Sequence, residues 1–182
     1  MTTLAKWSVD DYHLMIESGV LNNRSVELLA GEIIEMSPEG PLHRFTNDTV
    51  AEYLRELLRG RAKVFEAHPI TLSNSEPEPD IAVVRLPNSN YLTHHPYPED
   101  IYWLMEISNT TIEEDLGRKK KIYAIAGIDE YWVINLKTTE IIVFREPSGD
   151  DYKTKLTIDR GTITPIAFPN IQIEVTTLLG QT

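Results

Sequence analysis

The chain has 182 residues, enough for one domain with a sizeable core, and we expect residues 1–182 to form a single domain. Its 28 acidic and 17 basic residues give a formal net charge of −11, which argues against a general polyanion-binding surface. The chain lacks both a membrane-length apolar segment and a signal-peptide pattern, so we expect a cytoplasmic protein with no membrane partner. Because cysteine is absent, any metal ligands must be carboxylates, histidine or water.

The first third of the chain predicts two helices separated by a hairpin. A capping-box pattern at Ser8 predicts a helix that stops at Gly19. The stretch SVELLAGEIIEMSPEGP predicts two short strands that turn at Ala30. Apolar residues at helical spacing over 42–58 then predict a second helix with one buried face.

The middle of the chain predicts the centre of a sheet. The stretches AKVFEA and DIAVV predict strands, and the near-continuous apolar run IYWLMEIS predicts a central strand buried on both faces. A helix predicted over 112–126 leads into the strand EYWVIN. Strand, helix and strand in this order predict a parallel crossover, and therefore a mixed α/β fold.

The remaining segments predict edge strands and loops. The strand TEIIVFRE follows a hairpin turn at Lys137 and Thr138, and the strand-like pieces YKTKLTI and NIQIEV come near the end of the chain. The segment NSNYLTHHPYPED predicts a loop, and we assign no site role to its histidines, His94 and His95.

Two acidic residues occur where the pattern otherwise predicts burial. Asp80 directly precedes the apolar run of DIAVV, and Glu106 lies inside IYWLMEIS. A buried carboxylate must be paired, protonated or bound to a cation. If the two strands are neighbours, both carboxylates point at one spot, where a shared proton or a divalent metal relieves their repulsion, and we favour the metal. Glu76 and Glu78, between prolines just upstream, are interpreted as loop acids without a site role.

The predicted helix after Glu106 carries a cation on one face. Asp115, Lys119 and Tyr123 follow one another at four-residue spacing, which places them along the same face. Lys119 could reach back to Glu106, or it could form a solvated salt bridge with Asp115 worth roughly a few tenths of a kcal/mol. The spacing leaves both alternatives open. The basic run GRKKK over 117–121, and a smaller one through Arg55, Arg59, Arg61 and Lys63, could form a local basic site for nucleic acid, although a charge run of this kind is more often a solvated helix face.

Several stretches together resemble the Uma2 family of endonucleases: VELLAGEIIEMSP, His43, PEPDIAVV and MEISNTTIEEDLGRKKKIYAIAGIDEYWVIN. The resemblance covers about 26–145, and its most specific part is the D-x-x-x-K-x-x-x-Y-x-x-x-G-[IV]-x-E-Y-W run from Asp115 to Trp132. It implies the restriction-endonuclease-like fold of the PD-(D/E)-x-K superfamily. That fold is a mixed central sheet flanked by helices, here with an extra N-terminal hairpin and C-terminal strands.

The resemblance also implies roles for individual residues. Asp80 and Glu106 match the two metal-ligating acids of the superfamily motif. The superfamily places a lysine two residues after the second acid, a position that Ser108 holds in this chain. The resemblance implies that Lys119, on the following helix, has taken over the function of that lysine.

Two upstream residues join the site through the resemblance. Glu27 matches a further acid of the family, and His43 matches its histidine as a metal ligand or proton shuttle. The implied activity is hydrolysis of phosphodiester bonds in DNA, dependent on Mg²⁺ or Mn²⁺, by a homodimer. Two alternatives stay open: a catalytically inactive module of the same fold that binds a partner, and hydrolysis of a smaller phosphate ester.

Overall fold

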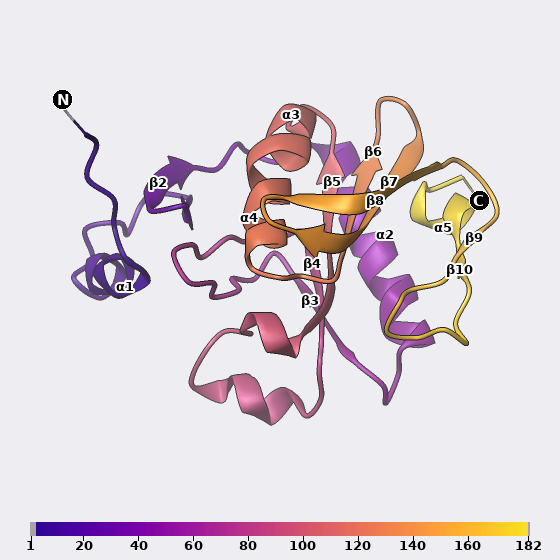
Figure 1. The fold of residues 1–182 in the computed structure, drawn as a ribbon, viewed down its shortest axis with the longest axis horizontal. Helices are drawn as coiled ribbons and strands as arrows, with labels where there is room; N and C mark the ends of the chain where they lie inside the picture. The colour runs from indigo at the N-terminus through magenta and orange to yellow at the C-terminus, as the bar shows by residue number, and fades with distance from the viewer. Residues whose placement is uncertain (1–2, 182) are drawn as a thin grey trace.

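The computed structural model describes residues 3–181 and has a six-stranded mixed sheet at its centre, in the order β3-β4-β5-β6-β7-β8 (Figure 1). The strands are β3 (Lys63–Glu66), β4 (Ile81–Val84), β5 (Ile101–Ser108), β6 (Glu130–Asn135), β7 (Glu140–Ser148) and β8 (Asp151–Ile158). The pair β5 and β6 is parallel, and the other neighbouring pairs are antiparallel. The predicted mixed sheet and its parallel crossover are therefore confirmed.

Helices cover both faces of this sheet. One face packs against α2 (Pro41–Leu57) and the short α5 (Val175–Leu178). The other face packs against a helical segment made of α3 (Ile112–Glu114), a π-helical turn η3 (Asp115–Lys119) and α4 (Lys120–Ile125). Because side chains alternate along a strand, β5 sends Trp103 and Met105 to the α2 side and Leu104 to the α4 side. This alternation decides which polar side chains meet.

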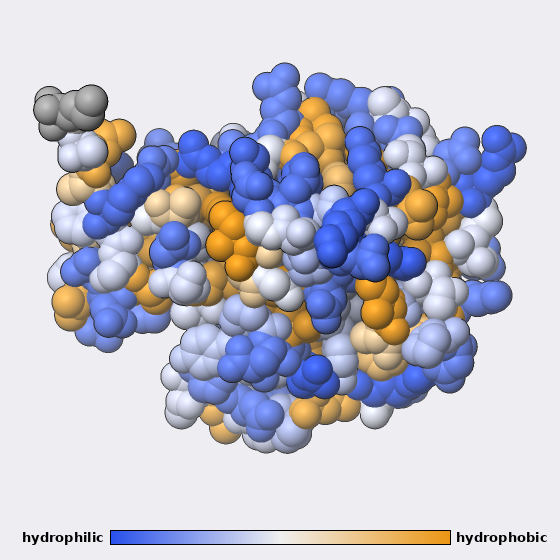
Figure 2. Space-filling view, viewed as in Figure 1, coloured by the Kyte–Doolittle hydropathy of each residue, from blue (hydrophilic) through white to orange (hydrophobic). Residues whose placement is uncertain are grey.

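The N-terminal segment forms a lobe beside the sheet, made of α1 (Val9–Glu17), β1 (Val26–Leu29) and β2 (Glu32–Glu35) (Figures 1 and 2). The predicted capping box is present, because the Ser8 hydroxyl accepts the Asp11 amide proton at 3.1 Å and the Asp11 carboxylate accepts the Ser8 amide proton at 3.0 Å. The β1–β2 hairpin turns at Ala30, as predicted.

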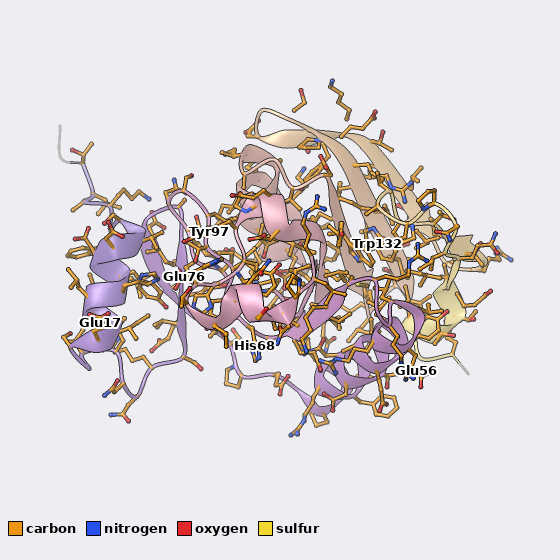
Figure 3. All side chains as sticks on the ribbon, turned by 90° about the horizontal axis from the view of Figure 1, so that it is seen from below. Glu17, Glu56, His68, Glu76, Tyr97 and Trp132 are labelled. Carbon is orange, nitrogen blue, oxygen red and sulfur yellow. The ribbon has the colours of Figure 1, made fainter. Side chains whose placement is uncertain are left out.

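Glu76 connects this lobe to the body of the molecule, between the two in Figure 3. Its side chain is 3% exposed, and its carboxylate lies 2.8 Å from His13 Nε2 on α1 and accepts the Thr71 hydroxyl proton at 2.8 Å. Its backbone bridges to Leu28 on β1. The interpretation of Glu76 as a mere loop acid is wrong, because the sequence pattern does not show that the lobe folds over it.

The helix predicted over 112–126 is present but interrupted by the π turn. The Lys120 amide donates to the Asp115 carbonyl five residues back, and the Tyr131 hydroxyl donates to the same carbonyl at 3.1 Å. This second donor comes from β6 and stabilises a wider turn that helix propensity does not encode.

Two other segments also differ from the prediction. The last predicted strand is reduced to β10 (Ile173–Glu174), which pairs with β9 (Thr162–Ile163) before α5 begins. The predicted loop over 88–100 contains two short 3₁₀ helices, η1 (Asn88–Leu92) and η2 (Pro98–Asp100). Among residues 3–181, every helix falls short of the length and apolar character needed to cross a bilayer.

Candidate active site

Asp80 and Glu106 meet across two neighbouring strands. In the antiparallel register of β4 and β5, Ile81 is opposite Met105, so Asp80 at the mouth of β4 is opposite Glu106. Both side chains belong to the sheet face that packs against α4, and the Asp80 amide donates weakly to Glu106 Oε2 at 3.4 Å. The expected convergence of the two acids is present in the structure. Glu106 is 2% exposed, whereas the Asp80 side chain is 17% exposed.

Lys119 reaches back from the π turn to this pair. Its Nζ lies 3.0 Å from Glu106 Oε1 and 3.8 Å from Glu27 Oε1, and the residue is 9% exposed. The Tyr123 hydroxyl donates to the same Glu106 Oε1 at 2.8 Å. The alternative of a solvated salt bridge with Asp115 is therefore wrong, because this helix face is buried against the sheet.

The position at which the superfamily has its lysine holds a hydrogen-bonded serine. The Ser108 hydroxyl donates to Asp115 Oδ2 at 2.6 Å, and the Thr111 hydroxyl donates to the same oxygen at 2.7 Å. Asp115 is 3% exposed. These bonds fix the first residue of the π turn to the end of β5, and so they fix the direction in which Lys119 leaves the turn.

Glu27 approaches the lysine from the N-terminal lobe. It is 5% exposed on β1, and its Oε2 accepts the Glu78 amide proton at 3.1 Å. The Glu78 carboxyl is half-buried, and both its burial and the charge of Glu27 raise its pKa. Glu78 lies in a loop, as predicted, but it borders the site, because its amide bonds to Glu27 and the charge of Glu27 raises its pKa.

His43, at the start of α2, faces Asp80 from the opposite side. Its Nε2 lies 3.1 Å from Asp80 Oδ2, and its Nδ1 lies 3.4 Å from Glu39 Oε2. Asp80 Oδ2 also accepts the Ile107 amide proton at 2.6 Å. The hydrogen bond to Asp80 raises the pKa of His43, although partial burial opposes the shift. All five residues selected from the sequence therefore form one continuous cluster: Glu27, His43, Asp80, Glu106 and Lys119.

The cluster contains more negative than positive groups. Burial raises the pKa of Glu106, Glu27 and Asp115, and Lys119 opposes each of these shifts. Burial by itself would lower the pKa of Lys119, but the carboxylates around it, Glu106 first, raise it, so the ammonium stays protonated. Glu106 and Glu27 contact the ammonium, whereas Asp115 and Asp80 act on it only through their charge, and acids exceed the buried ammonium in number, an imbalance that an additional proton or a divalent cation can offset.

The oxygen ligands of this cluster fit a hard divalent cation such as Mg²⁺ or Mn²⁺. One carboxylate oxygen of each acid is engaged by well-formed hydrogen bonds, Oδ2 in Asp80 and Oε1 in Glu106. Asp80 Oδ1 and Glu106 Oε2 are the oxygens left to face a cation. Over residues 3–181, no three histidine or acidic side chains form a complete metal cage. Mg²⁺ is typically held by one or two protein carboxylates, and water and substrate oxygens complete its coordination shell.

The rest of the basic run matches the prediction of a solvated face only in part, because Arg118 and Lys121 are exposed whereas the Lys120 side chain is 17% exposed. Arg118 pairs with Glu32 at 3.1 Å on β2 and with a glutamate one turn earlier, while Lys120 and Lys121 pair with two aspartates at the β7–β8 turn, at 2.8 and 3.6 Å. Lys119 alone in this run points into the acidic cluster. The run is therefore largely neutralised by the chain itself.

A mixed sheet flanked by helices, with two acids and a lysine converging at its strand ends, places the molecule in the class of restriction-endonuclease-like folds. The model of the family described as "Uma2: Putative restriction endonuclease" matches residues 9–176. The chain belongs to the Uma2 family. Family and fold together support a nuclease.

A solved structure supports the fold. The chain is similar to a protein from Anabaena variabilis ATCC 29413 whose crystal structure is titled as that of "a putative nuclease belonging to DUF820". The TM-score is 0.70 at 15% sequence identity, with 86% of this chain and 90% of the other covered. No curated protein matches the chain.

Proposed function

We propose that this protein is an endonuclease that hydrolyses phosphodiester bonds in DNA with the help of Mg²⁺ or Mn²⁺. In this proposal, Asp80 and Glu106 hold the metal, and Lys119 stabilises charge on the phosphoryl group or orients the nucleophilic water. The observation that carries the proposal is the acidic cluster at the strand ends, in which Asp80 meets Glu106 and the buried Lys119 ammonium lies 3.0 Å from Glu106 and 3.8 Å from Glu27. A purely structural site would be more stable with matched charges.

A bound divalent cation supplies Lewis-acid polarisation of the phosphoryl oxygen and lowers the pKa of a bound water. The residues of the chain do the remaining work. The Lys119 ammonium, fixed by Glu106 and Glu27, presents positive charge close to the phosphate that is cleaved. His43 lies between Asp80, 3.1 Å from Nε2, and Glu39, 3.4 Å from Nδ1, and its raised pKa suits it to exchange a proton with the leaving oxygen or with water. Its Nε2 already contacts Asp80, which favours the role of proton shuttle over that of metal ligand.

The test is cleavage of plasmid and oligonucleotide DNA in Mg²⁺ or Mn²⁺ by the wild type and by Asp80→Asn, Glu106→Gln and Lys119→Met. We expect each of the three variants to lose at least about 100-fold in rate, because each removes a metal ligand or the central cation. The matched controls are Asp150→Asn and Lys121→Met, which alter an exposed ion pair at the β7–β8 turn. Both controls are expected to cleave at the wild-type rate, and equal rates in all six proteins would refute the proposal.

The alternative of a non-catalytic binding module has one structural observation in its favour, the neutralisation of Arg118, Lys120 and Lys121 by acids of the same chain. Titration calorimetry with Mn²⁺ separates the two functions. The nuclease requires binding that Asp80→Asn weakens at least tenfold, whereas the module predicts no binding or unchanged binding. The homodimer remains part of the proposal, and analytical ultracentrifugation tests it directly.

A further inference from the structure

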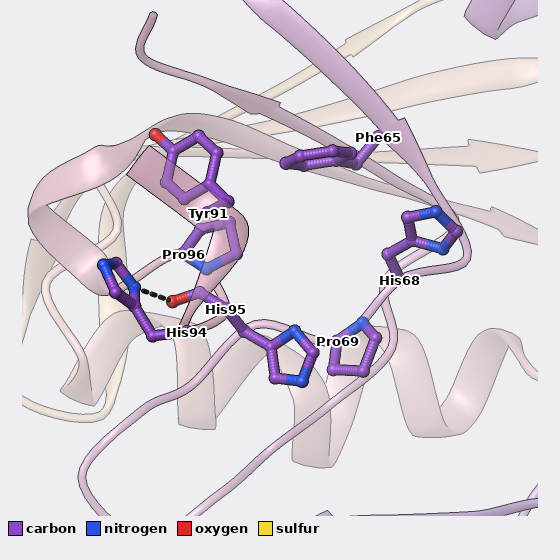
Figure 4. Close-up of a pocket in the computed structure, with 7 residues that line it drawn as sticks. All are labelled: Phe65, His68, Pro69, Tyr91, His94, His95 and Pro96. Atoms are coloured by element: carbon purple, nitrogen blue, oxygen red, sulfur yellow. Dashed lines mark hydrogen bonds between the residues drawn. The ribbon is translucent and has the colours of Figure 1, made fainter. Parts of the chain in front are cut away.

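A cavity of about 320 Å³ lies near the acidic cluster, between β3, the loop after it and the 3₁₀ segment η1 (Figure 4). Its volume is near the lower end of the range for small-molecule sites, roughly 300–1,000 Å³. Its wall consists of two aromatic rings, three histidines and two prolines: Phe65, Tyr91, His68, His94, His95, Pro69 and Pro96. No sequence pattern assigns a functional role to any of these residues.

The cavity borders the acidic cluster through β3. Phe65 pairs with Ala82 in the antiparallel register of β3 and β4, so it belongs to the same sheet face as Asp80. Two residues further along, the Ala67 amide donates to the Asp80 carbonyl at 3.1 Å. His68 follows directly and lies close enough to lower the pKa of Glu78, against the larger effect of burial. Phe65 and Asp80 are therefore diagonal neighbours on one sheet face, roughly 7–8 Å apart, and Glu106 lies one strand further on.

The walls of the cavity are suited to a flat, uncharged aromatic group. Phe65 and Tyr91 are half-buried and meet edge to face at 5.6 Å, and no carboxylate or ammonium is among the lining residues. Figure 4 shows the rings arranged around an open centre. Aromatic residues that leave a ring face open are the usual platform for stacking a nucleobase.

Two histidines of the wall are held by backbone carbonyls. His68 Nδ1 contacts the Ala67 carbonyl at 3.0 Å, and His94 Nδ1 contacts the His95 carbonyl at 2.8 Å. Because a carbonyl oxygen can only accept, Nδ1 donates in both contacts, and these bonds hold the two rings in place in the wall.

Charge supports the same reading of the cavity. A chain of net charge −11, whose basic run is largely paired with its own acids, has few cations with which to neutralise a phosphate backbone, although Lys63 Nζ lies 5.5 Å over the Phe65 ring beside the cavity. Base stacking supplies affinity without a free cation and does not depend on base sequence.

We propose that this cavity binds one unpaired nucleobase of the nucleic acid strand that the neighbouring acids cleave, so that the preferred substrate is single-stranded or locally unpaired DNA. The inference rests on the proposed nuclease function and specifies its substrate class. In a paired duplex the bases are stacked on one another, and a base enters such a cavity only after it leaves the stack.

The experiment measures binding of a fluorescein-labelled single strand and of the matching duplex by anisotropy, in a Glu106→Gln background in which cleavage is disabled. Phe65→Leu is the test variant, because it removes the ring but keeps an apolar side chain in the core. Trp7→Leu is the control, since it removes an aromatic ring that is 46% exposed in the N-terminal segment. We expect Phe65→Leu to bind the single strand roughly 5- to 150-fold more weakly, the loss of one stacked base, and Trp7→Leu to bind as the background does.

A second measurement uses the wild type without a DNA strand. Titration with deoxyadenosine monophosphate should shift the NMR ring signals of His68, His94 and His95 and leave the ring signals of His13 in place. Equal single-strand affinity of Phe65→Leu and Trp7→Leu, tighter binding of the duplex, or unmoved ring signals would each overturn the inference. Cleavage by the wild type combined with any of these results refutes the base site alone. Binding in the cavity without any cleavage refutes the nuclease alone.

Discussion

Replacing Lys119 with methionine removes the one ammonium that residues 3–181 bring into the acidic cluster. Methionine keeps much of the length and apolar volume of the lysine side chain, so the change mainly deletes a charge. Lys119 contacts Glu106 at 3.0 Å and Glu27 at 3.8 Å, and both partners are almost fully buried. Breaking a buried ion pair by removing one partner costs about 3–5 kcal/mol of folding free energy, because the remaining charge has no counterion. We expect a loss of this size for the metal-free protein at pH 8.

The pH dependence of that loss follows from the carboxylates. Burial raises the pKa of Glu106 in the folded state, and losing Lys119 raises it further. A carboxyl group with a raised folded pKa contributes stability below its unfolded pKa of about 4.3, and this contribution is lost as the pH rises through the folded value. The variant should therefore lose stability more steeply than the wild type as the pH rises above about 4.3 and through the folded pKa of Glu106.

Urea denaturation of the metal-free proteins at several pH values measures both effects. Lys121→Met is the matched control, because Lys121 pairs with Asp150 in an exposed contact at 3.6 Å that contributes at most about 1 kcal/mol. The double variant Lys119→Met with Glu106→Gln should recover part of the loss, since a neutral amide needs no counterion. If Lys119→Met unfolds at the same urea concentration as Lys121→Met at every pH, the electrostatic account of the cluster is refuted.

Three further predictions concern residues around the cluster. The pKa of His43, measured by NMR, should lie above its ordinary value of about 6.5 and fall in Asp80→Asn, and an unchanged pKa in the variant would contradict the hydrogen bond. The stability that His43 contributes should be complete below about pH 6.5 and disappear as the pH rises through the folded pKa. Tyr123→Phe should cost about 1–3 kcal/mol in urea denaturation, because Glu106 loses the donor at 2.8 Å; no change in stability would mean that the bond contributes nothing. Glu76→Gln should destabilise the folded chain by about 1.5–3 kcal/mol, because it weakens the buried contacts between lobe and body. Amide hydrogen exchange should become faster in α1 than in the central sheet, and uniform exchange in both regions would argue against this connecting role.

The sequence was sufficient for the sheet. Near-continuous apolar runs such as IYWLMEIS require burial on both faces, so any acid within them stands out, and the strand–helix–strand order permits only a right-handed crossover. These patterns single out Asp80 and Glu106, but pairing them required the two strands to be neighbours, and Glu27 and His43 were reached only through the family resemblance. The four-residue spacing of Asp115, Lys119 and Tyr123 placed the cation on a helix face, but it could not say whether that face met solvent or the sheet.

The tertiary structure decided the environment of these residues. Burial of Lys119 depends on the π turn. That turn is stabilised by the hydrogen bond that the Tyr131 hydroxyl, on a strand later in the chain, donates to the Asp115 carbonyl. Glu76 looks like a loop acid until the N-terminal lobe covers it. The aromatic cavity beside Asp80 likewise joins β3 to a loop more than twenty residues further along. Local patterns report which side chains leave the same face of one element, whereas long-range contacts determine what each side chain meets, and with it the pKa, the pairing and the chemistry.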